Sequence, residues 1–393
     1  MEGSIQNKNA RGQAGDAIRF GASSAPDPMR AVEEIQMLIW QPDMAFVIFF
    51  TSPEYDQENL IKALSCAFPD TTVVGCTTAG ELTPRGYAEG SITAISFSAQ
   101  HFKMQSRLIE NVLEKGISEF SKTANTLVSD TLCPDGWNTL ALQIADGMSL
   151  QEDVLVAALD AVLTPIPLFG GSAGDGMCFK ETFVYQDGVF HTDAALLMLI
   201  HTDYQFREIS FDHFIPSAEQ MVVTNAVPSE RIVSEINGEK AADEYARIIG
   251  APREKLGPFL FASHPTLVKA GGRYHVRAIQ SVINESSLKF LSAIDIGIVM
   301  TIGEALDIVG EMEKEFNHLE QEMGKPALIL GFDCILRKIE IVTSGKKNEI
   351  SRLLAENNVI GFSTYGEQHN GMHVNQTFVG VAFFPPKAGE LHD

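Results

Sequence analysis

The chain has 393 residues, enough for two or three domains, because a single hydrophobic core seldom grows beyond about 250–300 residues. Hydrophobic residues make up 45% of the chain and supply ample material for buried sheets. The 29 basic and 51 acidic residues give a net charge of -22, which opposes binding to phosphate backbones and anionic lipid. Nucleic acid and membrane surfaces are therefore not expected partners.

The cysteines and the termini indicate the cellular setting. Five cysteines are scattered without a CxxC pair, which argues against a structural zinc site or a disulfide framework. The first 16 residues lack the apolar stretch of a secretory signal, and the apolar run at 194–200 is too short to cross a bilayer. We expect a cytoplasmic protein with reduced thiols and with flexible tails at residues 1–25 and 387–393.

Helices and strands alternate along the N-terminal half. The first predicted helix covers residues 28–39, with Asp27 as its N-cap and Pro28 at its first position. Further elements are predicted in this order: an apolar strand at 45–52, a helical pattern at 60–68, a strand at 90–98, a polar helical stretch at 110–132, a strand at 139–144, a helix at 149–163 and a hairpin turning at 186–188.

The pattern breaks at residues 212–228, where Pro216 and Pro228 bracket a short strand, and we place a domain junction here. The elements predicted beyond it are a turn at 237–238, a helix at 241–249, strands at 272–281 and 288–294, a helix at 305–321, an apolar run at 327–334 and a strand at 375–384. The predicted class is α/β (α+β), with related layered domains at 26–215 and 216–386 whose mixed sheets are covered by helices.

An internal repeat relates the two halves. Residues 73–81 read VVGCTTAGE, and residues 359–367 read VIGFSTYGE. An apolar run precedes and follows each copy, which indicates an internal duplication. A shorter variant, LFGGSAGD at 168–175, also follows an apolar run and keeps the order of small residue, glycine and acid.

These glycine loops leave the ends of strands, where backbone N–H groups could meet a small ligand. A second interpretation is that the glycines only permit tight turns and that the carboxylates cap backbone N–H groups. The candidate residues on the loops are Gly75, Thr77, Thr78, Gly80, Glu81, Gly171, Ser172, Asp175, Thr364, Gly366 and Glu367.

The sequence offers little support for an enzyme. Cys76 at the entrance of the first loop could be a nucleophile or a small packed residue, but the second copy has Phe362 in its place and no histidine is near. No HExxH, GxSxG or Walker signature is present. A hydrolase that uses Cys76 or Thr77 is the weakest hypothesis, and we predict no catalytic residues.

Histidine is the residue type best suited to iron ligation. His213 lies between Phe211 and Phe214 at the predicted junction, an aromatic setting suited to a planar cofactor. His264 follows an apolar segment, and His373 lies beside the last glycine loop. For each histidine, a hydrogen-bonded structural role is the alternative, and the absence of a CxxCH motif excludes covalent heme attachment.

Several segments together resemble a known family. GCTTAGE at 75–81, LFGGSAGD at 168–175, EINGEKAADEYAR at 235–247 and GFSTYGEQHNGMHVNQTFVGVAF at 361–383 resemble the paired FIST N and FIST C sensory domains of bacterial signalling proteins. Five more segments are similar to the stand-alone nitric-oxide-sensing hemoproteins of that group: SSAPDP at 23–28, DHFIP at 212–216, VRAIQSV at 276–282, FDCILRKIEI at 332–341 and TYGEQ at 364–368.

The resemblance implies a sensor that binds heme b, takes nitric oxide at the iron and regulates a separate histidine kinase or a cyclic-di-GMP enzyme (a diguanylate cyclase or phosphodiesterase). A homodimer is a further expectation. The resemblance fixes no ligand residue, so His213 is chosen as the iron ligand on its aromatic setting, with His264 and His373 next. The alternative is a heme-free module that holds an amino acid in the glycine loops.

Overall fold

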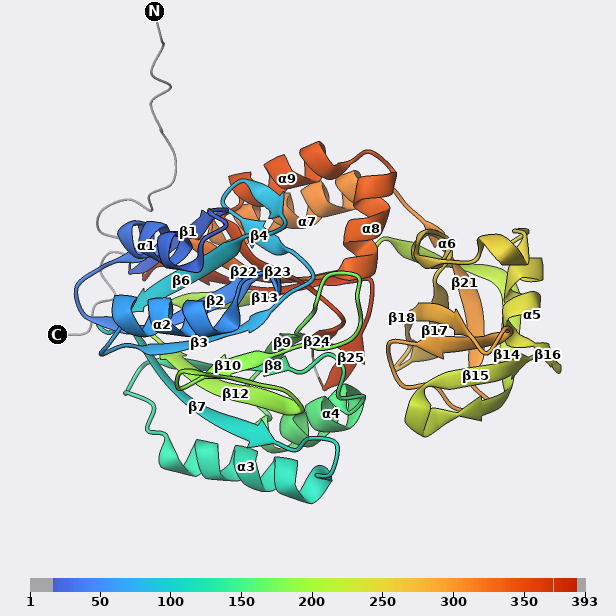
Figure 1. The fold of residues 1–393 in the computed structure, drawn as a ribbon, viewed down its shortest axis with the longest axis horizontal. Helices are drawn as coiled ribbons and strands as arrows, with labels where there is room; N and C mark the ends of the chain where they lie inside the picture. The colour runs from blue at the N-terminus through green and yellow to red at the C-terminus, as the bar shows by residue number, and fades with distance from the viewer. Residues whose placement is uncertain (1–16, 370, 387–393) are drawn as a thin grey trace, which may run out of the picture.

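The computed structural model describes residues 17–369 and 371–386. They form a larger body with helices on its outside and a smaller domain beside it (Figure 1). The larger body contains three copies of one unit, in which three strands alternate with helices and are followed by a hairpin and a last strand. The mixed α/β class predicted from the sequence is confirmed, and the shorter variant of the repeat at 168–175 belongs to a full copy of the unit.

The three units follow one another along the chain. The first contains β1 (Ile18–Ser23), α1 (Pro28–Ile39), β2 (Met44–Thr51), α2 (Gln57–Ala67), β3 (Thr72–Thr77), β4 (Glu81–Thr83), β5 (Gly86–Ala88) and β6 (Ile92–Ser98). The second contains β7 (Phe102–Glu110), α3 (Ile117–Asp130), β8 (Asn138–Ala145), α4 (Glu152–Leu163), β9 (Leu168–Ser172), β10 (Val184–Gln186), β11 (Val189–His191) and β12 (Ala194–Thr202).

The third unit is interrupted after its first strand by the smaller domain. Its elements are β13 (Gln205–Phe211), α7 (Ile308–Met323), β22 (Leu328–Cys334), α8 (Ile335–Thr343), α9 (Lys347–Glu356), β23 (Val359–Thr364), β24 (Glu367–His369), β25 (Met372–Val374) and β26 (Phe378–Phe384). The smaller domain comprises β14 (Phe214–Val227), β15 (Ile232–Ile236), β16 (Glu239–Lys240), α5 (Ala241–Ile248), α6 (Pro258–Ser263), β17 (Thr266–Ala270), β18 (Arg273–Arg277), β19 (Ile279–Ile283), β20 (Ser287–Phe290) and β21 (Val299–Ala305), with 3-10 turns at Pro228–Glu230 and Arg253–Lys255.

The three units exchange their hairpins. The sheet of the first unit, β1-β6-β2-β3, is extended by the hairpin β10-β11 of the second unit. In the same way, the second sheet takes β24-β25 from the third unit, and the third sheet takes β4-β5 from the first. The exchange is cyclic, so each hairpin covers what would otherwise be an open sheet edge in a neighbouring unit.

One glycine recurs at the same register position in all three units. Gly75, Gly170 and Gly361 each pair with a residue of the adjacent parallel strand. An added Cβ would lie 2.2 Å from the Phe49 oxygen, 2.1 Å from the Gln143 oxygen and 1.7 Å from the Gly331 oxygen, respectively. Close backbone approach therefore explains this glycine, and Gly75 has a packing role.

The inner faces of the three sheets share one core. This core contains Phe46 and Ile95 from the first sheet, Leu142 from the second, and Leu330 and Val381 from the third. The outer faces are covered by helices, with α1 and α2 on the first sheet, α3 and α4 on the second, and α7 and α9 on the third (Figure 1). Successive side chains of a strand point to opposite faces of its sheet, so each strand contributes apolar side chains both to the shared core and to the layer under the helices.

Predicted and observed elements agree most closely for the first helix. Its bounds are the predicted 28–39, and the Asp27 carboxylate accepts a hydrogen bond from the Arg30 N–H at 2.9 Å. The predicted tail at 1–25 is wrong for residues 18–23, which form β1 and pair with β6. The rest of that tail up to residue 16, and the tail at 387–393, lie outside the described residues.

Two other predicted segments are divided in the structure. The polar stretch at 110–132 begins with the end of β7, and its helix starts at Ile117. The strand predicted at 272–281 is broken at Ala278 into β18 and β19, which belong to different parts of the smaller domain's sheet. The predicted junction at 212–228 lies where the chain enters the smaller domain.

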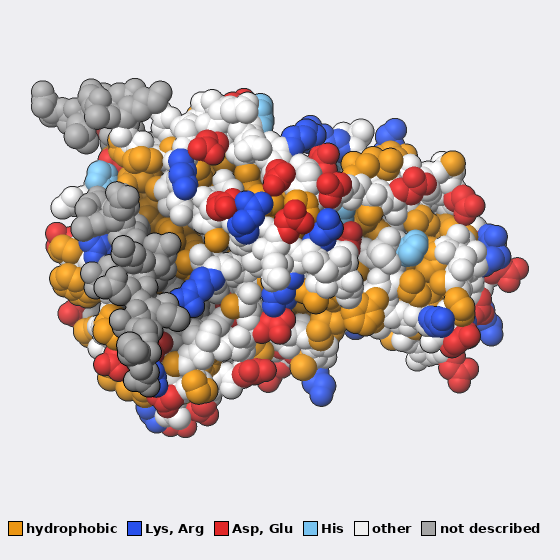
Figure 2. Space-filling view, turned by 90° about the horizontal axis from the view of Figure 1, so that it is seen from above, with side chains coloured by type: hydrophobic (Ala, Val, Ile, Leu, Met, Phe, Trp, Pro, Cys, Tyr) orange, Lys and Arg blue, Asp and Glu red, His pale blue; other side chains and the backbone are white. Residues whose placement is uncertain are grey.

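Charged side chains do not gather by sign on the face drawn in Figure 2. Acidic and basic groups of the described residues are interspersed there among apolar ones. A nucleic-acid-binding surface normally carries clustered Lys and Arg, so this face does not have that character.

Candidate functional site

The three glycine loops meet and are joined by a ring of backbone hydrogen bonds. The Ala79 N–H donates to the Ser363 oxygen at 2.9 Å, and the Gly174 N–H donates to the Thr77 oxygen at 3.0 Å. The Tyr365 N–H closes the ring by donating to the Ser172 oxygen at 3.2 Å. The first and last loops, whose corresponding residues Val73 and Val359 are 286 positions apart in the sequence, therefore join the second loop in one cluster, which confirms their shared architecture.

Most of the loop N–H groups and hydroxyls are used inside the protein. The Thr77 hydroxyl accepts from the Phe183 N–H at 3.0 Å, and the Ser172 hydroxyl accepts from the Gln368 amide at 2.9 Å. Gly171 packs so closely that an added Cβ would lie 2.6 Å from the Thr364 side chain. These positions serve packing and leave no space for a ligand.

The two repeated glutamates are buried hydrogen-bond acceptors. Glu81 accepts from the Thr78 hydroxyl at 2.6 Å and from the Ser91 hydroxyl at 2.5 Å. Burial raises the pKa of the Glu81 carboxyl from 4.5 to about 7, although both hydroxyls oppose the change. Glu81 therefore exchanges its proton near neutral pH.

Glu367 repeats this arrangement in the third unit. Its carboxyl accepts from the Thr364 hydroxyl and, at 2.8 Å, from the Thr377 hydroxyl. Complete burial raises the pKa of Glu367 from 4.5 to about 8. An added Cβ on Gly366 would lie 2.1 Å from the His373 ring, so this third loop is fully packed.

Asp175 differs from both glutamates. The strand register places it at the position of Gly80 and Gly366, one residue before the glutamates. Its carboxylate accepts N–H groups from residues 179, 180 and 181 at 2.7, 2.8 and 3.0 Å, and the Tyr365 hydroxyl also donates to it. Burial alone would raise the pKa of Asp175, but these donors hold it below its ordinary value. The capping interpretation fits this carboxylate.

A cleft of about 380 Å³ opens beside the first loop. Its lining comes from five places: the segment before α2, the first loop and its hairpin, the segment that begins at Asp175, α8, and α6 of the smaller domain. Of the predicted loop residues, Thr78, Gly80, Glu81 and Asp175 line it. Its apolar wall consists of Met177, Phe259, Ile335, Ile339 and Val342.

Lys338 on α8 is the cation of this cleft. Its side chain is only 5% exposed, and its Nζ lies 2.9 Å from the Ala79 oxygen and 2.8 Å from the Glu89 carboxylate. Gly80 makes room for it, because an added Cβ there would lie 2.2 Å from the Lys338 Nζ. The Glu89 side chain is 70% exposed and lies at the rim. The cleft thus joins a nearly buried ammonium group, a movable carboxylate and an apolar wall.

Cys76 is no nucleophile in this arrangement. Its side chain is buried, and burial, with a further contribution from the charge of Glu81, raises the pKa of the thiol well above its ordinary value. A thiol in this state is inert, as expected for the packed residue that was the alternative interpretation.

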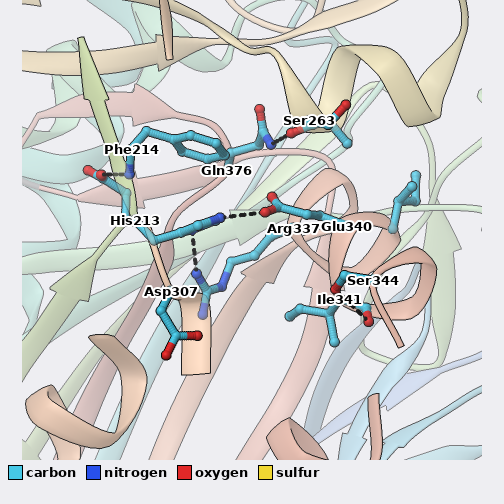
Figure 3. Close-up of polar contacts among 12 residues, drawn as sticks. His213, Phe214, Ser263, Asp307, Arg337, Glu340, Ile341, Ser344 and Gln376 are labelled. Carbon is cyan, nitrogen blue, oxygen red and sulfur yellow. Dashed lines mark hydrogen bonds and ion pairs between the residues drawn. The ribbon is translucent and has the colours of Figure 1, made fainter. Parts of the chain in front are cut away.

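The structure places His213 in the connection from β13 to the smaller domain (Figure 3). Its Nε2 lies 2.8 Å from a Glu340 carboxylate oxygen, and its Nδ1 lies 3.3 Å from an Arg337 guanidinium nitrogen. The Phe214 ring lies 4.1 Å away between centroids. Phe211 instead stacks on Phe378 in the core. Both ring nitrogens of His213 therefore have protein partners.

The other two candidate histidines have different surroundings from His213. His373 is buried, its Nδ1 lies 3.3 Å from the Gln368 amide, and its Nε2 has no hydrogen-bond partner. His264 ends α6, with its Nδ1 2.9 Å from the Ser263 hydroxyl. Among the described residues, these three histidines form no group that could hold a metal ion.

A second cavity of about 600 Å³ lies between β13, α7 and the β17–β18 hairpin. Three further histidines, His275, His318 and His369, line it together with Arg207 and Arg273. Within residues 17–369 and 371–386, no three His, Cys, Asp or Glu side chains are grouped to hold a metal ion.

Sequence reasoning does not single out Lys338, Glu89 or Phe259. One signal was available: in FDCILRKIEI, four charged residues interrupt an otherwise apolar segment. Charged residues that a helix must bury need partners, so such an interruption indicates an internal polar contact.

Comparisons with known proteins place the chain in a family. Residues 45–239 match the FIST N domain and residues 241–370 match the FIST C domain. The division near residue 240 falls inside the smaller domain, so the family domains do not coincide with the packing units. A comparison with curated proteins finds no match at a significant level.

Among solved structures, cyanuric acid hydrolase from A. caulinodans is similar over 48% of this chain and 72% of that chain, with 9% identity and a TM-score of 0.25. A likeness this slight supports no inference about function. None of the described helices is long and apolar enough to span a membrane. The chain belongs to the proteins that join a FIST N domain to a FIST C domain, and these domains make it a sensor in signal transduction.

Proposed function

We propose that the cleft beside the first glycine loop senses a free amino acid with an apolar side chain. The observation that carries the proposal is Lys338, whose nearly buried ammonium group has one exposed carboxylate, Glu89, as its ionic partner. A ligand carboxylate can replace Glu89 at Lys338, which releases Glu89 to accept the ligand's ammonium group. The apolar wall receives the side chain, and the volume of about 380 Å³ suits a molecule of this size.

L-Leucine, L-methionine and L-phenylalanine are the probes for this site. We expect at least one of them to raise the melting temperature, because a ligand at one hundred times its Kd stabilises the folded state by about 2.7 kcal/mol. L-Leucinamide, which lacks the carboxylate, should have no effect. The measurement is a thermal-shift titration followed by calorimetry.

The Lys338→Met variant should lose the response to these amino acids. Lys314→Met is the matched control, because Lys314 is exposed on α7 and away from the cleft. Equal shifts with leucine and leucinamide, or an unchanged response in Lys338→Met, would refute the proposed site.

The heme b and nitric oxide implied by the resemblance stay a prediction, and the surroundings of His213 and His373 do not fit an iron ligand. An iron ligand needs a free ring nitrogen, but both nitrogens of His213 are engaged. The unpartnered Nε2 of His373 faces the backbone, since an added Cβ on Gly366 would lie 2.5 Å from it. A porphyrin has no room there.

Absorption spectra test this disagreement. We expect hemin added to the purified protein to give the same Soret band with wild type and with His213→Ala. A Soret shift that responds to nitric oxide and disappears in His213→Ala would overturn our interpretation of His213. The partner, a histidine kinase or cyclic-di-GMP enzyme, remains part of the proposal under either ligand.

A further inference from the structure

Helix α8 contacts the cleft on one side. On its other side it contacts the two chain connections that join the smaller domain to the larger body. Lys338 and Ile339 line the cleft. Arg337 and Glu340, which come just before and just after them, hold His213 (Figure 3). One turn of helix therefore contacts both places.

His213 lies where the chain both enters and leaves the smaller domain. It directly precedes β14, and its carbonyl oxygen accepts the Leu306 N–H at 2.7 Å, just after β21 ends. The two connections are thus hydrogen-bonded to each other and, through the His213 ring, to α8. His213 is 1% exposed, so water does not compete for these bonds.

Arg337 links these two connections to the core of the larger body. Its Nε lies 2.9 Å from the Asp333 carboxylate, and its guanidinium carbon lies 5.0 Å from the centre of the Phe211 ring. The Tyr87 hydroxyl, from the hairpin of the first glycine loop, donates to the same Asp333. A displacement of α8 would change the contacts of Arg337 with Asp333, with the Phe211 ring and with His213 together.

The smaller domain also reaches the cleft directly. Helix α6 packs on α8, and its Phe259 lines the cleft while remaining 65% exposed. The smaller domain also contacts the larger body at a place separate from α8. There, an Arg231 guanidinium nitrogen lies 2.6 Å from a Glu152 carboxylate oxygen and 3.0 Å from an Asp153 carboxylate oxygen.

We propose that α8 couples the cleft to the smaller domain, so that a ligand beside Lys338 shifts α8 and His213 transmits this shift to the two connections. The smaller domain's position is then the signal that a partner reads. The inference rests on the proposed ligand site, and it assigns His213 a positioning role. Because such coupling is reciprocal, loosening His213 must also weaken ligand binding.

Hydrogen–deuterium exchange of the full chain tests the coupling without requiring a known ligand. Lys338→Met should speed exchange in residues 212–216 and 304–308 by about fivefold or more. Lys314→Met should leave these segments unchanged. Exchange around Arg231 and in the core strand β12 should stay as in wild type, which separates a local effect from general destabilisation. Unchanged exchange in both connections of Lys338→Met would overturn the proposal.

A second experiment measures hydrogen–deuterium exchange and L-leucine binding in wild type and in His213 variants. We expect leucine to slow exchange at 212–216 and 304–308 in wild type, and His213→Ala to lose this response and bind leucine about fivefold or more weakly. His213→Gln keeps a side-chain N–H donor toward Glu340 and should restore both properties. Leucine binding that is equal in His213→Ala and wild type would refute the coupling. Failure of leucine, methionine and phenylalanine to bind wild type would refute the proposed function, while the Lys338→Met result would still decide the coupling.

Discussion

Replacing Arg337 with alanine should lower the free energy of unfolding by about 3–5 kcal/mol, because it leaves the Asp333 carboxylate buried without its cation. Both side chains of this pair are 0% exposed. Burial raises the pKa of Asp333, and Arg337 opposes this change in wild type. The loss should be measured by urea denaturation at pH 7.

The pH dependence of this loss separates lost charge pairing from lost packing. In Arg337→Ala the pKa of Asp333 rises further, so Asp333 becomes neutral at mildly acidic pH and the deficit at pH 5 should be smaller than at pH 7. Arg352→Ala is the control, because its partner Glu356 is also exposed and such pairs contribute about 0–1 kcal/mol. Equal losses of unfolding free energy in Arg337→Ala and Arg352→Ala would contradict the view that Arg337 stabilises the fold by pairing with the buried Asp333.

Glu367→Gln should change how stability depends on pH. The Glu367 carboxyl has a pKa of about 8 in the folded protein and an ordinary value of 4.5 when unfolded. Between these values the folded state binds more protons, so stability falls as the pH rises. The contribution is fully present below about pH 4.5 and is lost as the pH rises through about 8.

Between about pH 4.5 and pH 8, the contribution of Glu367 to the free energy of unfolding should fall by roughly 4–5 kcal/mol. Glutamine stays neutral, so Glu367→Gln should gain stability relative to wild type as the pH is raised from 5 to 9. Urea denaturation at each pH measures it, and Glu356→Gln, at an exposed position, should run parallel to wild type. A Glu367→Gln curve that is also parallel to wild type would show that the buried carboxyl is not neutral.

Local signals in the sequence were sufficient for several elements. The first helix begins and ends as predicted because Asp27, Pro28 and the apolar spacing of its buried face all act within a few residues. The repeated glycine loops were also recognisable, since close backbone approach excludes side chains at Gly75 and Gly361 wherever the unit occurs.

The second unit was harder to see in the sequence. Its loop at 168–175 carries alanine where the others carry threonine, and Gly176 stands where they have glutamate. The interruption of one unit by the smaller domain further separates β13 from α7. A short repeat cannot show which hairpin completes which sheet, because that choice depends on neighbours across the three-unit assembly.

The family, the mixed α/β class, the repeated loops and the aromatic neighbours of His213 follow from the amino-acid sequence, because each depends on residues close together in the chain. The contacts that these residues make could be seen only in the folded protein. Glu340 lies 127 residues from His213, and Lys338 lies 259 residues from Ala79. From sequence alone, a charged side chain is expected to be exposed to solvent unless the residues that bury it are known. The cleft and the helix that connects it to the smaller domain could therefore be recognised only in the folded structure.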